Sequence, residues 1–189
     1  MSVETLLPEL GAAIENGDVA ETRRLVGNVL ALDPLHVGAL EILRLDYARS
    51  GIWQGEVELG RRLMVVEPQD GDHAIALAGS LAKSAHFGEA VRSAKYALMS
   101  SPDNLEFAMK AASVLFSAGE FNAAWEICMP FLQAGAAPAG LVFMAGRALR
   151  KLGRTSEAEA LLKSVGEANP KLAGPVRVVL LSATREDFG

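Results

Sequence analysis

Residues 119–125 read GEFNAAW, and the small residue at the start of this stretch recurs every 34 residues along the chain. It recurs without insertion or deletion at Gly17, Gly51, Ala85, Gly119 and Gly153. Large side chains follow two positions later at Val19, Trp53, Phe87 and Phe121, whereas the fifth unit has Thr155. A second series with the same period contains Pro34, Pro68, Pro102 and Pro170, with Ala136 at its missing position and Pro138 two residues later. One structural unit is therefore repeated five times.

Each unit predicts two helices. A small residue at the middle of the unit suits the left-handed turn that ends a first helix, and the proline ends the second helix. Each half then holds roughly 12 to 14 helical residues. Apolar residues recur three and four positions apart in the first halves, for example at Leu40, Leu43 and Tyr47. Since one helix pair cannot bury its apolar face alone, several pairs must stack around a continuous core.

The sequence therefore predicts an all-α domain over residues 1–189, with no strand. The expected repeats span about 3–36, 37–70, 71–104, 105–138 and 139–172, and a capping helix follows at about 175–186. Alanines at Ala90, Ala124 and Ala158 allow close packing of the second helices, whereas Thr22 and Glu56 predict looser packing in the first two repeats. Pro130 lies inside a predicted second helix, so we expect a kink or an early end and a longer turn at 133–138.

These residues resemble the tetratricopeptide repeat. The likeness is clearest in GEFNAAW, in HFGEAV at 86–91 and in GRTSEAEALL at 153–162, and Gly146 matches the glycine of the family's first helix. It covers residues 3–170. The resemblance implies a right-handed α-solenoid of five antiparallel helix pairs. The clamp with which some members hold a terminal carboxylate is missing, because its positions hold Gly11, Ile42 and Leu7.

Composition narrows the class of protein. The net charge of −5 argues against nucleic acid, which requires a basic face. Residues 1–136 carry 18 acidic and 10 basic side chains, a net charge of −8, whereas residues 137–189 have a net charge of +3. The single cysteine, Cys128, excludes an internal disulfide and predicts a packed thiol in the cytoplasm. No secretory signal is evident at the start, and the uncharged stretch 127–146 is predicted to be helix, turn and helix, not a membrane span.

No catalytic or metal-binding pattern stands out. The histidines lie at or near repeat junctions without a second ligand at metal-binding spacing, and solvated turn positions are expected for His36, His73 and His86. The glycines belong to the repeat and do not form a phosphate loop. We therefore expect no cofactor, no metal and no enzyme activity in this chain.

The resemblance also predicts a binding surface, because first helices line the concave side in the tetratricopeptide family. Carried onto this sequence, the partner-binding residues are Ile42, Leu45, Arg49, Ile75, Gly79, Lys83, Met109, Lys110, Ser113, Phe116, Phe143, Arg147 and Arg150. This groove is apolar in its middle and basic toward its far end.

The sequence predicts a protein-interaction scaffold, an adaptor or a chaperone that binds a peptide or helix of a partner through an apolar anchor. One alternative is a self-assembling structural module. The other is the repeat region of a larger enzyme such as a transferase. For the C-terminal helix we expect Val179 to face the fifth repeat, and Val178 and Leu181 either to meet a partner or to fold into the core.

Overall fold

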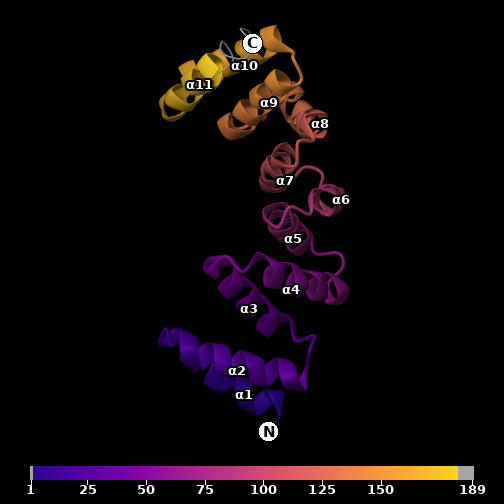
Figure 1. The fold of residues 1–189 in the computed structure, drawn as a ribbon, viewed down its shortest axis with the longest axis vertical. Coiled ribbons are helices and arrows are strands. Elements are labelled where there is room, and N and C mark those ends of the chain that lie inside the picture. Colours follow the sequence, from indigo (N-terminus) through magenta and orange to yellow (C-terminus); the bar gives the residue numbers. More distant parts are fainter. Residues whose placement is uncertain (1, 183–189) are drawn as a thin grey trace.

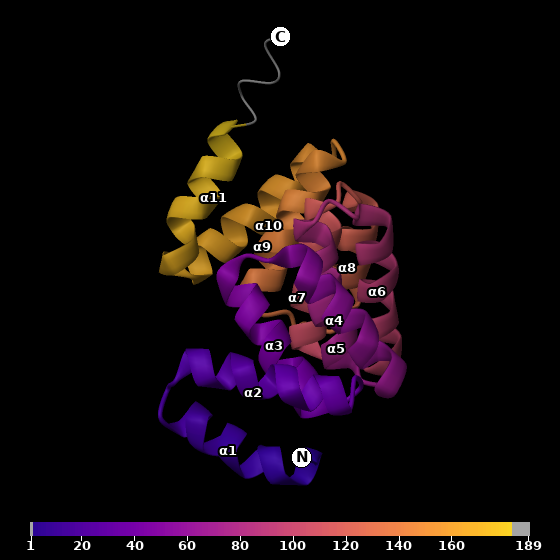
Figure 2. The same cartoon turned by 60° about the horizontal axis from the view of Figure 1, so that its bottom comes forward.

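A computed structural model describes residues 2–182, and within this range the chain forms eleven helices and no strand (Figure 1). The first ten helices form five consecutive pairs, as predicted. Their bounds are α1 Val3–Glu15, α2 Val19–Leu32, α3 Val37–Ser50, α4 Trp53–Val66, α5 Gly71–Lys83, α6 Phe87–Ser100, α7 Leu105–Ser117, α8 Phe121–Gln133, α9 Ala139–Lys151 and α10 Thr155–Ala168. The last helix, α11, spans Pro170–Ser182. The pairs stack one after another into an elongated solenoid (Figures 1 and 2).

The turn within each pair lies at the small residue of the repeat. The backbone φ angle at these residues is positive: 67° at Gly17, 70° at Gly51, 80° at Gly119, 75° at Gly153 and 61° at Ala85. Glycine adopts this conformation without a steric penalty, whereas Ala85 adopts it with a Cβ atom present. The repeat therefore imposes the same turn even where the sequence lacks glycine.

The core consists of the small and aliphatic side chains that face neighbouring helices. Ala90, Ala124 and Ala158 are fully buried, as expected for close packing of the second helices. Glu56 stands at the equivalent position of α4 and is also buried, with its Oε1 atom 3.5 Å from Arg44 Nη1 on α3. A buried ion pair thus replaces the small alanine in the second repeat.

Pro130 lies inside α8, and the helix continues through it to Gln133. The other second helices have 14 residues, whereas α8 has 13. Gly135 has a φ of 66°, and the turn extends from Ala134 to Pro138 before α9 begins. The helix therefore does not end at Pro130: it ends one residue earlier than its equivalents, and the turn that follows is longer, as predicted. No helix in the described part of the chain is long and apolar enough to cross a membrane.

The C-terminal helix begins five residues earlier than the predicted 175, so that boundary was wrong. Pro170 is the first residue of α11, and the Asn169 side chain accepts a hydrogen bond from the Lys171 amide at 3.1 Å. Proline is favoured at the first helical position because its missing amide would have no helical partner there. Val176 packs on Leu162 and Val165 of α10, with Val179 beside them. The predicted end near 186 lies outside the described residues.

Candidate binding groove

The first helices of the last three repeats form one continuous surface, because α5 packs against α7 and α7 against α9 (Figure 1). The thirteen predicted partner-binding residues lie on these three helices and on α3, which packs against α2 and α4. We call the surface formed by these residues the groove. It contains an N-terminal pocket, a middle pocket and a cluster of arginine and phenylalanine side chains.

The N-terminal pocket has a volume of about 280 Å³ and lies where α1, α2 and α3 meet. Three predicted residues line it, Ile42, Leu45 and Arg49. Arg23 Nε and Nη2 donate hydrogen bonds to the Asp46 carboxylate at 2.7 and 2.9 Å, and this contact holds the pKa of Asp46 below its usual value. Isoleucine, leucine and valine side chains make up most of the remaining lining, so the pocket is mainly apolar with one ion pair at its wall.

Sequence reasoning missed the part of this pocket that comes from the first repeat. Ile14 of α1 and Val19 of α2 line it and are 47% and 55% exposed. These two residues were not predicted, because the binding residues were expected only on first helices, from the second repeat onward. Ile14 and Val19 lie on either side of the Gly17 turn in the first repeat.

The middle pocket has a volume of about 340 Å³ and brings together five predicted residues: Ile75, Gly79, Lys83, Lys110 and Ser113. Ile75 itself is buried, so it contributes to the wall from the core side. Lys83 Nζ lies 4.0 Å from the centre of the Trp53 ring, a cation–π contact. Lys110 pairs with Glu106 at 2.6 Å, and this lowers the pKa of Glu106.

Sequence reasoning did not predict four residues that line the middle pocket, Glu56, Ala76, Ser80 and Val114, of which Glu56 is the charged one. Its Oε1 atom faces Arg44, whereas its Oε2 atom is buried without a hydrogen-bond partner. The signal was present in the sequence, since Glu56 replaces the alanine of later repeats. At this repeat position the later repeats have a buried alanine, whereas Glu56 pairs with Arg44 and lines the middle pocket.

The third part of the groove lies between α7 and α9. Arg147 Cζ lies 4.2 Å from the centre of the Phe116 ring and 5.8 Å from that of Phe143. Phe143 is half-buried and packs beside Leu162 and Val165 in the core. Met109 is 40% exposed, and its side chain reaches Gly140 at the start of α9. Arg150 follows Arg147 by one turn of α9, and its Nη1 atom is buried and without an acceptor.

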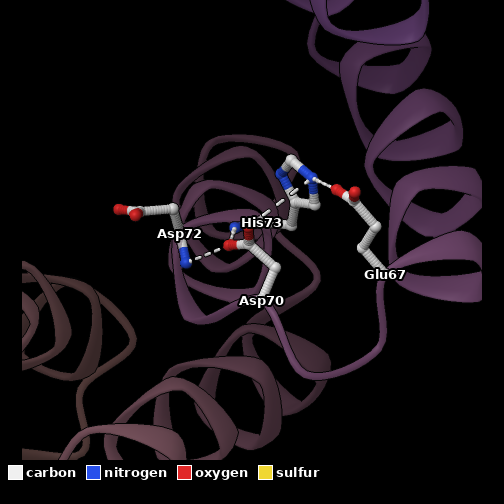
Figure 3. A network of polar contacts seen from close by, with 4 residues as sticks. All are labelled: Glu67, Asp70, Asp72 and His73. Carbon is white, nitrogen blue, oxygen red and sulfur yellow. Dashed lines mark hydrogen bonds and ion pairs between the residues drawn. The ribbon is translucent and has the colours of Figure 1, made fainter. Parts of the chain in front are cut away.

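A separate polar network occupies the junction between α4 and α5 (Figure 3). His73 was expected to be a solvated turn residue, and this was wrong: its side chain is 5% exposed. His73 Nε2 lies 2.8 Å from Glu67 Oε2 and 4.0 Å from Asp70 Oδ2. Asp70 Oδ1 accepts from the amides of Asp72 and His73 at 2.7 and 3.0 Å, which caps α5. The imidazole is thus a buried, hydrogen-bonded group at the junction between the second and third repeats.

Glu67, Asp70 and His73 are residue types that bind divalent metals, and their candidate ligand atoms lie within 4.8 Å of one another. The observed contacts give all three a structural role, as a helix cap and a hydrogen bond between helices. The other two histidines also lie at helix starts: His36 Nδ1 accepts from the Ala39 amide at 3.2 Å, and His86 precedes α6 and is exposed. Cys128 is fully buried, and burial raises the pKa of its thiol to about 12.

No family model and no curated protein matches the sequence. Solved structures do match in fold. A crystal structure of MamA covers 91% of this chain and 94% of its own, at 19% identity and a TM-score of 0.76. TTC0263, a thermophilic TPR protein in Thermus thermophilus, covers 95% of this chain and 100% of its own, at 17% identity and a TM-score of 0.62. The chain is therefore an all-helical repeat protein of the tetratricopeptide type in its fold.

Proposed function

We propose that this protein is an interaction scaffold, an adaptor or a chaperone, that binds a segment of a partner protein in the groove. The observation that carries the proposal is that predicted residues from four first helices line two pockets and one arginine–phenylalanine cluster on the groove. Repeat solenoids commonly use such extended surfaces for binding. The single buried cysteine fits a cytoplasmic, reducing compartment.

Apolar anchors are available for such a segment. Leu45 is 46% exposed in the N-terminal pocket, and Met109 is 40% exposed beside α9. A methionine side chain adapts to different partner shapes, and a few large side chains usually dominate an interface. We infer that an amphipathic helix or an extended apolar segment binds across these two positions.

The test compares two methionines by affinity capture and mass spectrometry. Met109→Asp should remove the proteins captured by the wild-type chain, because it places a charge at the centre of the groove. Met99→Asp is the matched control, since Met99 of α6 is 80% exposed and is not a groove residue. Circular dichroism checks that both variants fold. Equal capture by Met109→Asp and the wild type would place the binding site elsewhere.

A self-assembling module is the second candidate, and α11 favours it. Val178 is 67% exposed, so its side chain does not belong to the core. Sedimentation velocity over a hundredfold range of concentration tests this candidate. A mass that rises with concentration for the wild type but not for Val178→Lys would support it, and a constant monomer mass would exclude it.

A further inference from the structure

Eleven arginines lie within residues 2–182. Six of them form ion pairs, namely Arg23, Arg24, Arg44, Arg61, Arg62 and Arg154. Three arginines of the groove, Arg49, Arg147 and Arg150, have no carboxylate within 4.0 Å among residues 2–182. Two of them, Arg147 and Arg150, lie together on α9. The α9 end of the groove therefore holds two guanidinium groups that no carboxylate among the described residues pairs.

The unpaired guanidinium of Arg150 lowers the stability of the protein when no partner is bound. Its Nη1 atom is buried and donates no hydrogen bond. A buried donor without an acceptor is destabilising, and more so when it is charged. Arg150 as a whole is only partly buried, so its other guanidinium N–H groups can donate to a ligand oxygen.

Arg147 lies on the same face of α9, one turn before Arg150. Its contact with the Phe116 ring holds the guanidinium at the groove surface. A guanidinium above an aromatic ring keeps its N–H donors for a second partner, and these donors match a carboxylate in a bidentate geometry.

The charged residues of α9 itself have one sign. Helix α9 contains Arg147, Arg150 and Lys151 and no acidic residue. Elsewhere on the groove positive and negative charges occur together, because Lys110 pairs with Glu106 and the middle pocket contains the buried Glu56. A segment with carboxylates therefore complements the α9 end of the groove specifically.

We propose that Arg147 and Arg150 bind carboxylate groups of an acidic partner segment, with Met109 and Phe143 contacting an apolar side chain beside them. This inference rests on the proposed function of the groove and adds the chemistry and the direction of the bound segment. Its acidic part lies over α9, and its remainder extends toward α7 and α5.

The experiment screens the full chain against an array of random dodecapeptides, each displayed with a free or an amidated carboxyl end. Peptides that bind should be enriched in aspartate and glutamate. Exchanging glutamate for glutamine in a selected peptide should weaken binding at least about tenfold, as expected for a charge-assisted hydrogen bond. Loss of binding on amidation alone would assign the carboxylate to the peptide terminus, and retained binding would assign it to side chains.

Variants locate the site. Arg147→Gln and Arg150→Gln should each remove the preference for acidic peptides, whereas Arg177→Gln should keep it. Arg177 is the matched control because it lies exposed on α11 and also forms no ion pair among the described residues. Arg150→Gln should leave the melting temperature unchanged or raise it, since the unpaired buried donor is lost.

Three results would overturn the proposal: no acidic enrichment, equal binding of glutamate and glutamine peptides, or acidic preference that survives in both groove variants. Selection of apolar peptides without acidic enrichment would overturn this inference while leaving the proposed function intact. Selection of no peptide at all would count against both.

Discussion

Gly146 of α9 contacts Leu162 of α10 so closely that a Cβ atom on the glycine would lie 2.7 Å from Leu162 Cγ. Leu162 is fully buried and packs with Val165 and Val176, so it has little room to move. Helices α9 and α10 can therefore pack this closely because Gly146 has no side chain.

Gly146→Ala should destabilise the fold by about 1–3 kcal/mol, because the added methyl group overpacks this contact. Denaturant unfolding measures the change. Gly11→Ala is the control, since a Cβ atom at Gly11 of α1 would meet nothing within 4 Å. The control should be neutral or stabilising, as alanine favours helix. An equally stable Gly146→Ala variant would show that the core relaxes freely there.

Ala85→Gly should stabilise the protein by about 0.5–1 kcal/mol, because Ala85 adopts a left-handed conformation that glycine tolerates better. The φ angle of Ala85 is 61°. Ala118→Gly provides the comparison, since Ala118 has a φ of −78° at the end of α7 and should lose stability on the same change. Thermal unfolding distinguishes the two. Loss of stability in both variants would contradict the prediction.

The pKa of the Cys128 thiol predicts a loss of stability at high pH. Burial raises this pKa from 9.0 to about 12. Between these values the unfolded chain releases a proton that the folded chain keeps, so folding stability falls as pH rises, by up to about 1.4 kcal/mol per pH unit. Cys128→Ala removes this contribution. Unfolding free energies from pH 8 to pH 11 should therefore fall more steeply for the wild type, and parallel curves would refute the assignment.

The pair formed by His73 and Glu67 should couple α5 to the preceding junction. We expect a coupling free energy of about 0.5–1.5 kcal/mol, the usual net contribution of a hydrogen bond. A double-mutant cycle with His73→Ala and Glu67→Ala measures it at constant pH. Strict additivity of the two substitutions would mean that the 2.8 Å contact contributes nothing to stability.

Helix count, turn positions and the core faces were predictable because local chemistry determines them. Gly17, Gly51, Gly119 and Gly153 supply the backbone conformation that the turns need, and the apolar spacing of each first helix directs one face inward. The same regularity placed Ala85 correctly in a turn without glycine. It also placed five predicted residues in one middle pocket, since equivalent positions of stacked repeats line one surface.

Tertiary structure alone decided the features that depend on neighbours in space. The imidazole of His73 is buried at the junction between α4 and α5, and no local sequence pattern indicates that burial. The pocket contribution of Ile14 and Val19 arises where the first repeat meets α3. Arg150 lacks an acceptor only because no acidic side chain among the described residues lies beside it in the packed solenoid. Periodicity determines which residues face inward, whereas packing determines which polar groups find a partner.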